Sequence, residues 1–502
     1  MNSKEIAFKK IDYETKKKID MIKIICKKLS YGELAYCIYY LHMVRISKSK
    51  LSNLKNFEHM SLDRLNDVLN HSISCIFKYA NISRIQKNDY SVNENSCELI
   101  IKLVDSLHNL HEKYSLLTLL DEFELEGERN QHIKIDISKI TIHPDKMKYF
   151  EYVARFQTSI NIDKEETINH TIHLKNFVEK YSKYNLISKD IFGLEIEEIS
   201  DKLSTLLNIC KDNIMRNRIN IPSIEDDIID HLDIKTLRET IKSFIFNEKE
   251  LLEIFGKKGM KFIREFIFKK SEFKSYEMNY HYILRSPILK IKNEYIISPE
   301  LLVDSLFLNF HYTLLENKQH SEKHKKIMSD AFVNEILDIS KKYGFVHFGS
   351  EVELYQGKNK LGDIDLILRH KKLDLDILIE AKNHAVPLPV YHGIYEKINK
   401  RFEELKKDWE SKVHKRYIHL IDNNEKYNIK KTFKYLIVTK YPEILSHDSD
   451  YLVLTIDEFN FYLQNDFQFS NFRDLCDELY KHKKLDEQEI IKLMKVLNCK
   501  IK

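Results

Sequence analysis

Two short apolar segments that carry charge at every second position constrain the fold of this chain most. Residues 362–368 read Gly-Asp-Ile-Asp-Leu-Ile-Leu, and residues 377–382 read Ile-Leu-Ile-Glu-Ala-Lys. Alternation with period two is typical of β-strands, so each segment is predicted to be a strand. Asp365 lies on the charged face of the first strand, and Glu380 and Lys382 share one face of the second. Charges on such an apolar pair of strands are costly to bury unless they hold a metal ion or one another.

Two carboxylates beside a lysine have the chemistry that metal-assisted cleavage of a phosphodiester needs. Asp365 and Glu380 are predicted to hold Mg²⁺ or Mn²⁺, which lowers the pKa of a bound water and offsets charge on the phosphate. Lys382 is predicted to stabilise the developing charge or to orient the attacking water. The two strands therefore predict a hydrolytic site.

This pattern resembles the PD-(D/E)xK nucleases, a superfamily with the restriction-endonuclease-like fold. Asp365 corresponds to the motif aspartate, Glu380 to the second acidic residue, fifteen positions later, and Lys382 to the motif lysine. The proline that nominally precedes the aspartate is absent, and Asp363 and an isoleucine stand there instead. The resemblance covers roughly residues 328–460. It implies a nuclease that requires Mg²⁺ or Mn²⁺ and acts on nucleic acid, with DNA favoured over RNA.

Two more acidic residues are candidate metal ligands. Asp363 shares the face of Asp365 and is either a second ligand or the solvated start of a strand. Glu335 lies on a predicted helix over residues 330–343. In some members of the superfamily a glutamate from the first helix reaches the metal; the alternative for Glu335 is a solvated position on that helix.

Three polar residues near the predicted site are expected to have no catalytic part. Glu351 and Glu353 share a face of the preceding strand and could approach the site, but exposed strand positions are favoured. His384 follows Lys382 on the same face and could contact phosphate, but it reads better as a plain polar residue at the end of a strand.

The placement of glycine divides the chain. Five of its ten glycines fall within fifty residues, at positions 344, 349, 357, 362 and 393. Because glycine serves tight turns and bulges, this clustering predicts a strand-rich region there and a helical body before it. We expect a mainly helical region over residues 1–245, a connecting unit with a small hairpin and a helix over 246–327, and a nuclease domain over 328–502.

The sequence of the third region predicts a definite order of helices and strands. A helix is followed by three strands, a long helix and two further strands, over residues 330–343, 345–354, 362–369, 376–383, 391–414, 433–439 and 451–455. The fold class is therefore predicted to be multidomain, with a mainly α N-terminal region and a C-terminal α/β domain. In that domain a mixed central sheet is flanked by helices, as the resemblance to restriction endonucleases implies. One other alternating stretch, residues 132–140, could be a strand or an edge hairpin.

Residues 257–274 interleave lysine and arginine with four phenylalanines, Phe262, Phe266, Phe268 and Phe273. Such a segment could contact phosphates and stack on bases. The alternative, which the pattern favours, is an amphipathic helix whose phenylalanines lie in the core.

Composition restricts the class of protein further. Lysine and arginine together number 81 against 77 acidic residues, a net charge of +4, so any basic surface must be local. The seven cysteines form no Cys-x-x-Cys pair, which argues against a structural zinc site. The chain also lacks a signal-peptide pattern and a run of eighteen apolar residues. These features predict a cytoplasmic protein that does not enter the membrane.

The sequence thus predicts a cytoplasmic, magnesium-dependent endonuclease that binds DNA, with bacterial anti-phage defence as a hypothesis for its role. Two alternatives remain within the fold: a non-catalytic nucleic-acid-binding or scaffold protein, and an RNA nuclease. A third is that the motif is coincidental and the chain is a helical interaction protein, which fewer than four strands between residues 345 and 455 would favour. The family resemblance also suggests a homodimer. The N-terminal region is expected to bind substrate or a protein partner.

Overall fold

The computed structural model describes most of the chain. The described residues are 3–46, 62–82, 92–119, 146, 148–149, 151–152, 155, 170–218, 240–273, 282–384, 390 and 395–479. The stretch at 132–140 that could form a strand lies outside them. The chain divides into two compact units: one comprises residues 1–7, 113–165 and 322–502, and the other comprises 8–112 and 166–321.

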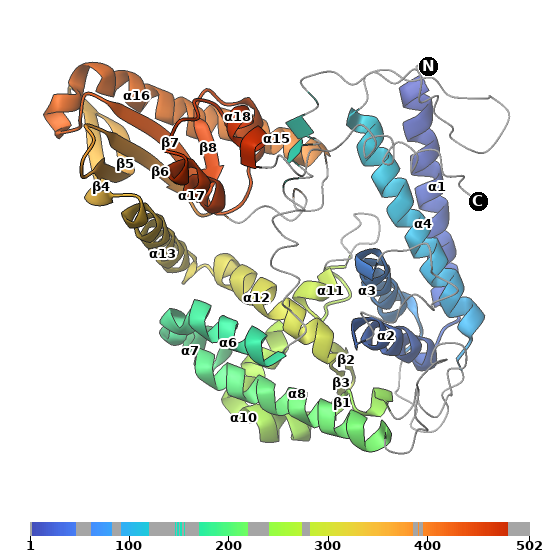
Figure 1. The fold of residues 1–502 in the computed structure, drawn as a ribbon. Helices are drawn as coiled ribbons and strands as arrows, with labels where there is room; N and C mark the ends of the chain where they lie inside the picture. Colours follow the sequence, from blue (N-terminus) through green and yellow to red (C-terminus); the bar gives the residue numbers. More distant parts are fainter. Residues whose placement is uncertain are drawn as a thin grey trace. The chain divides into compact units, whose positions relative to one another are not determined.

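The first unit is built on a mixed five-stranded sheet with the order β4-β5-β6-β7-β8 (Figure 1). Its strands are β4 (Phe345–Gln356), β5 (Asn359–His370), β6 (Asp376–Lys382), β7 (Phe433–Thr439) and β8 (Leu452–Thr455). Strand β5 pairs antiparallel with both β4 and β6, whereas β6, β7 and β8 are parallel to one another. The five strands predicted between residues 345 and 455 are therefore confirmed.

Helices cover both faces of this sheet because both faces are apolar. One face packs on α15 (Tyr395–Leu405), the π-helix η5 (Lys406–Glu410) and α16 (Ser411–Asn423), through a core that includes Leu378, Tyr435, Ile437 and Val453. The other face packs on α13 (Ser321–Lys342), α17 (Ile456–Gln464) and α18 (Phe472–Leu479). Since residues of one strand alternate between the two faces, Leu378 belongs to the first core and Ile377 and Ile379 to the second. A mixed sheet between two helical layers is thus confirmed.

The long helix predicted over 391–414 differs from the observed one. It runs on to residue 423, and one turn of π-helix interrupts it at η5. The extra residue of a π-turn shifts the helix face, and such turns are frequent at functional sites. The only tryptophan of the chain, Trp409, lies in this turn and is buried.

Residues from a distant part of the sequence complete the first unit. Tyr149 and Tyr152 are buried in the core beneath α15 and α16, and the Tyr149 hydroxyl donates to Oδ1 of Asn399 at 2.5 Å. Arg155 binds Glu458 on α17 through two hydrogen bonds, from Nε at 2.6 Å and from Nη2 at 2.5 Å. The sheet and its own helices therefore do not account for the whole core of this unit.

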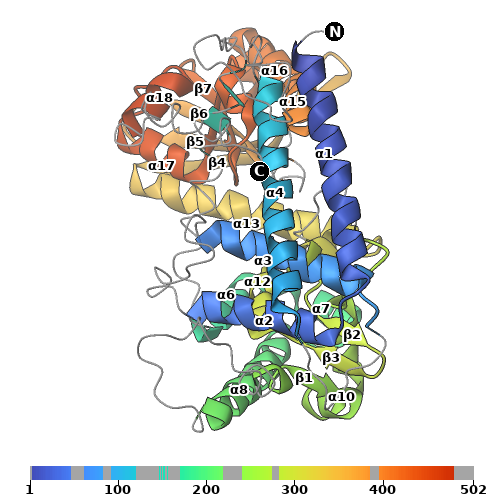
Figure 2. The same ribbon diagram turned by 90° about the vertical axis from the view of Figure 1, so that its right-hand side faces the viewer.

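The second unit is mainly helical. Its helices include α2 (Tyr31–Ile46), α3 (Leu62–Tyr79), α6 (His170–Tyr181), α7 (Asn185–Phe192), α8 (Ile196–Arg218), α10 (Glu248–Glu265), α11 (Tyr282–Arg285) and α12 (Pro299–Glu316). Most of α1 (Ser3–Cys26) and of α4 (Glu94–Leu119) also belongs to it. Helices α2 and α3 lie side by side in both ribbon views (Figures 1 and 2). Ser298 caps α12, and a proline follows it in the first turn of the helix.

A small antiparallel sheet accompanies these helices, in the order β1-β3-β2. The predicted hairpin is confirmed as β2 (Leu289–Ile291) and β3 (Glu294–Ile296). The third strand, β1 (Ile245–Asn247), was not predicted, because three residues are too few to show a period.

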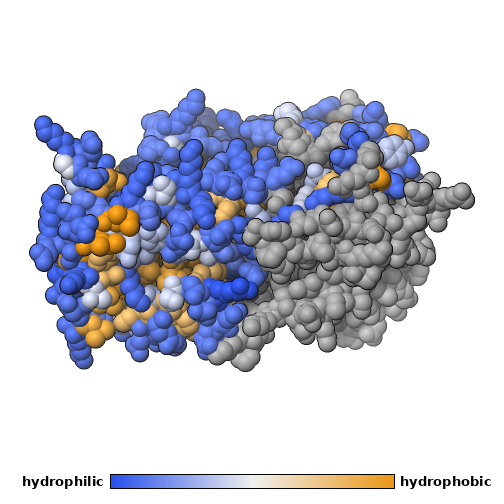
Figure 3. Space-filling model, turned by 90° about the horizontal axis from the view of Figure 1, so that it is seen from above, coloured by the Kyte–Doolittle hydropathy of each residue, from blue (hydrophilic) through white to orange (hydrophobic). Residues whose placement is uncertain are grey.

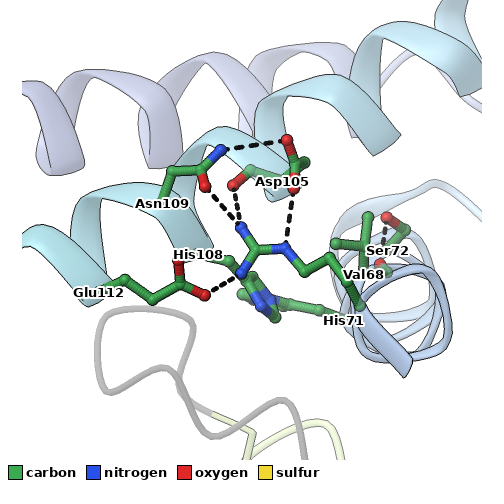
Figure 4. A network of polar contacts seen from close by, with 8 residues as sticks. Val68, His71, Ser72, Asp105, His108, Asn109 and Glu112 are labelled. Atoms are coloured by element: carbon green, nitrogen blue, oxygen red, sulfur yellow. Dashed lines mark hydrogen bonds and ion pairs between the residues drawn. The ribbon is translucent and has the colours of Figure 1, made fainter. Parts of the chain in front are cut away.

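Arg64 joins α3 to α4 in the second unit. Its Nε donates to Oδ1 of Asp105 at 2.9 Å and its Nη2 to Oδ1 of Asn109 at 3.0 Å, while Nη1 contacts Glu112 (Figure 4). Beside it, His71 and His108 meet through their ring nitrogens at 3.1 Å. The guanidinium is thus fixed by several acceptors at once, which favours a structural role.

The four phenylalanines of residues 257–274 lie in the core of the second unit. Phe262, Phe266 and Phe273 are fully buried, and 3% of Phe268 is exposed. They pack on one another and on neighbouring aromatic rings, so that none presents a face to solvent. The base-stacking interpretation is therefore wrong. The phenylalanines lie in the core, as the alternative predicted, but the predicted helix covers only part of the segment, because α10 ends at Glu265.

The described surface is largely hydrophilic in the view of Figure 3, with apolar side chains gathered in a few places. Within the described ranges, no helix combines the length and the apolar character that spanning a bilayer requires.

Candidate active site

The backbone pairing between the central strands β5 and β6 ends where the predicted catalytic residues begin. The last backbone pair of their register is Leu366 with Ile379. Beyond it the amide of Ala381 donates to the side chain of Asp365, at 2.7 Å to Oδ2, rather than to a backbone carbonyl. The carboxylate of Asp365 is therefore held in the opening between the two strands.

The backbone on the other side of Asp365 is also irregular. Ser350 pairs with Leu366 and Val352 with Ile364, so Glu351 of β4 lies opposite Asp365. Glu351 has a φ of 51°, in the left-handed region that residues other than glycine rarely adopt. Such a conformation costs on the order of 1–3 kcal/mol and persists only where the surrounding structure imposes it.

Glu380 and Lys382 lie next to Asp365 on one face of the sheet. Nζ of Lys382 is 2.6 Å from Oε1 of Glu380 and 3.9 Å from Oδ2 of Asp365. The Glu380 side chain is 7% exposed, that of Lys382 18% and that of Asp365 29%. The structure thus brings together the three residues predicted to be catalytic and leaves two of them partly open to solvent.

Burial and the neighbouring acids disfavour the charged form of Asp365. Burial, followed by the negative charge of Glu380, raises the pKa of Asp365 from 3.8 to about 6, although Lys382 and the Ala381 amide act in the opposite direction. Perturbed carboxylates of this kind are concentrated at functional sites, where several charges are held close together.

Arg416 of α16 is a member of this cluster that the sequence did not reveal. Its Nη1 lies 2.5 Å from Oε2 of Glu380, and its side chain is 6% exposed. Tyr435 of β7 neighbours the same guanidinium, and burial followed by the charge of Glu380 raises the pKa of Tyr435. In the sequence, Arg416 is one of many charged residues of a helix, and nothing distinguishes it from a solvated one.

A signal for Arg416 was nevertheless present in Gly362. This glycine has a φ of 121°, and a Cβ built on it would lie 2.4 Å from Nη2 of Arg416. The guanidinium therefore lies directly on the backbone of β5, where no larger residue fits. A glycine just before an acidic strand segment indicates such a close approach.

The other predicted candidates make different contacts. Glu335 accepts two hydrogen bonds from Nζ of Lys440, both at 2.9 Å, so its carboxylate is engaged. Asp363 pairs in register with Glu353 of β4. Glu351 and Glu353 are exposed, as expected, and Glu353 forms an ion pair with Lys360 at 2.6 Å.

Trp409 borders the site from the π-helix. Its ring centroid is 6.0 Å from Nζ of Lys382 and 5.3 Å from the guanidinium carbon of Arg401. The exposed ring of His384 lies 5.4 Å from it. The π-turn therefore sets an aromatic ring beside the predicted catalytic lysine, where it can interact with the positive charge.

The donor atoms of the site suit Mg²⁺. Oxygen ligands from one or two carboxylates, completed by water, are the usual protein ligands of this ion, and Asp365 and Glu380 supply two carboxylates. Within the described residues, however, no three acidic, histidine or cysteine side chains are arranged to hold a metal. Glu335 is paired with Lys440, and both oxygens of Glu380 are paired with cations.

Comparison of the chain with protein-family models, with curated proteins and with solved structures gave no match. The fold and the cluster around Glu380 therefore have to be interpreted from their own geometry.

Proposed function

We propose that the chain is a Mg²⁺-dependent nuclease that hydrolyses phosphodiester bonds, with DNA favoured over RNA, and that its sheet unit is of the PD-(D/E)xK type. The observation that carries this proposal is the meeting of Asp365, Glu380 and Lys382 on one sheet face, where β5 and β6 part. An acid-acid-lysine cluster of this kind has the groups that the chemistry requires.

Each of these residues has a distinct part in the proposed reaction. Asp365 and Glu380 would hold the metal, which lowers the pKa of a bound water and offsets the charge of the phosphate. Lys382, which is partly exposed, would donate a hydrogen bond to the phosphate or to the attacking water as negative charge develops. The Ala381 amide, which donates to Oδ2 of Asp365, would fix the orientation of that carboxylate.

The test is hydrolysis by the full-length protein of supercoiled plasmid, single-stranded DNA and structured RNA, with Mg²⁺, with Mn²⁺ and with a chelator. The proposal predicts metal-dependent cutting of at least the plasmid. Cutting of RNA alone would favour the RNA nuclease. Tight DNA binding without cutting under every condition would favour a non-catalytic member of the fold and contradict the proposal.

The hypothesis of anti-phage defence depends on this activity. Expression of the chain in a phage-sensitive host should then lower plaque counts, and a Lys382→Met variant should restore them. Equal plaque counts with and without the wild-type chain would contradict that role.

A further inference from the structure

Glu380 is held by two cations that differ in their freedom to move. Lys382 binds Oε1 at 2.6 Å, and Arg416 binds Oε2 at 2.5 Å. Lys382 lies at the end of β6 on a flexible stem, with 18% of its side chain exposed. Only 6% of the Arg416 side chain is exposed. Lysine can therefore withdraw into solvent, whereas withdrawal of the arginine would require a change in the packing of α16.

Gly362 confines Arg416 further. A Cβ at this position would lie 2.4 Å from Nη2, 2.7 Å from Nε and 2.9 Å from Cζ of Arg416. Nη2, Nε and Cζ of Arg416 therefore lie against the backbone of β5, while Nη1 binds Glu380. The contact is a single charge-assisted hydrogen bond from Nη1 of Arg416 to Oε2 of Glu380, so it fixes one oxygen of that carboxylate.

We infer that Arg416 is a positioning residue that stays bound to Oε2 of Glu380. A divalent cation can then bind this carboxylate only at Oε1, where it replaces Lys382. The inference rests on the proposed function. A divalent cation near Asp365 and Glu380 would add two charges to a site that already holds two cations, and like charges this close repel strongly. The cation that can move is Lys382, so binding of the metal and release of Lys382 from Glu380 are coupled.

Because of this coupling, Lys382 becomes available to a phosphate only when the metal is bound. Before metal binding, Lys382 is an internal partner of Glu380 and is not available to a phosphate. Once released, it lies at the open edge of the same site. Arg416 thus determines which of the two cations gives way.

Trp409 offers a direct readout of Lys382. It is the only tryptophan in the chain, and its ring centroid lies 6.0 Å from Nζ of Lys382. Indole fluorescence responds to a charge at this distance, so movement of Lys382 should change it.

The experiment is a titration of the full-length protein with Mg²⁺, followed in parallel by calorimetry and by tryptophan fluorescence. For the wild type, we expect a saturable fluorescence change over the concentrations at which heat of binding is observed. For Lys382→Met, we expect binding at least about tenfold tighter, because a competing charge is gone, and little fluorescence change.

Variants of Arg416 distinguish positioning from mere stabilisation. Arg416→Met frees Oε2, so Mg²⁺ should bind without displacing Lys382, and the fluorescence change should be lost while the heat of binding remains. Arg416→Lys restores a cation and should recover part of the signal. If Arg416→Met does not fold by circular dichroism, Gly362→Ala, which pushes the guanidinium aside, should have the same effect.

Arg369→Met is the matched control. Arg369 also lies on β5 and forms a two-point ion pair with a buried acid, Asp376, at the opposite end of the strand pair. This variant should keep the fluorescence response and the Mg²⁺ affinity of the wild type.

Two results would overturn the inference alone. One is a folded Arg416→Met protein with unchanged affinity and fluorescence response. The other is a wild type that binds Mg²⁺ without a fluorescence change, together with unchanged affinity in Lys382→Met. Absence of any Mg²⁺ binding by the wild type at millimolar concentrations would instead remove the proposed function, and the inference with it.

Discussion

The charge of Asp365 is unfavourable for the fold without metal. Its pKa in the folded protein, about 6, lies above the ordinary value of 3.8, first because of burial and then because of Glu380. The folded state therefore binds a proton more tightly than the unfolded state does. The contribution of Asp365 to stability is therefore largest below about pH 4 and is lost as the pH rises through 6, above which Asp365 is ionised in both states.

Removing this charge should stabilise the metal-free protein. In the presence of a chelator at pH 7.5, Asp365→Asn should raise the free energy of unfolding by about 1–3 kcal/mol, which is the cost of a pKa raised by this amount. Below about pH 4 the gain should vanish. Urea denaturation at both pH values measures it, with Asp338→Asn, an exposed acid, as control. A less stable Asp365→Asn protein at pH 7.5 would contradict this interpretation.

The residues of the site differed in how well the sequence revealed them. Asp365, Glu380 and Lys382 could be predicted because alternation along a strand is a local pattern. Arg416 could not, because its partner Glu380 is 36 positions away and only the packing of α16 brings them together. For Glu335, the sequence gave no sign that Lys440 would bind its carboxylate.

At the level of elements, the strands of the sheet were predicted well. The strand over 433–439 has the predicted bounds, and β5 begins three residues earlier than expected, at Asn359. The interruption of the long helix at η5 was missed, because a single inserted residue barely disturbs an apolar pattern that continues on both sides. This error matters because the π-turn places Trp409 beside Lys382.

Helix α10 allows a test of the favoured interpretation of the basic, phenylalanine-rich segment, in which the phenylalanines lie in the core. Phe262 is fully buried and packs on Phe192, Phe255 and Phe266. Phe262→Ala should therefore lower the free energy of unfolding by about 3–5 kcal/mol. Lys257→Ala, at an exposed position of the same helix, should change it by less than about 0.5 kcal/mol. Chemical denaturation of both variants gives the comparison, and a cost below about 1 kcal/mol for Phe262→Ala would show that the ring is not part of the core.

At the level of the whole molecule, the sequence could not show that the sheet unit recruits residues from before position 165. The predicted domain over 328–502 lacks Tyr149, Tyr152 and Arg155, which belong to the same compact unit and line or contact its core. Contacts between segments so far apart leave no periodic trace in the sequence. The predicted domain boundaries stay predictions, and fragments that begin near residue 322 should be less stable than the intact chain.

Substitutions in the ion pair of Arg155 and Glu458 would measure how much the segment around Arg155 contributes to stability. The side chain of Arg155 is 5% exposed and that of Glu458 is 1% exposed. Arg155→Met would leave a buried carboxylate without its cation and should cost about 3–5 kcal/mol of stability in the full-length protein. Adding Glu458→Gln should recover part of this loss, since the uncompensated charge is then gone. Urea denaturation of the single and double variants tests it, and a single variant as stable as the wild type would mean that the segment around Arg155 does not complete the core.

The most direct test of the proposed active site is a comparison of two neighbouring lysines. Lys382 and Lys440 lie on adjacent strand ends, joined by a backbone hydrogen bond of 3.1 Å, but Lys382 pairs with Glu380 and Lys440 with Glu335. The measurement is Mg²⁺-dependent cleavage of supercoiled plasmid by the wild type, Lys382→Met and Lys440→Met, each confirmed to be folded. We predict that Lys382→Met lowers the rate at least a hundredfold, as loss of one charge-stabilising group does, while Lys440→Met keeps it within a few-fold. Undiminished cleavage by Lys382→Met would show that the acid-acid-lysine cluster is not the active site.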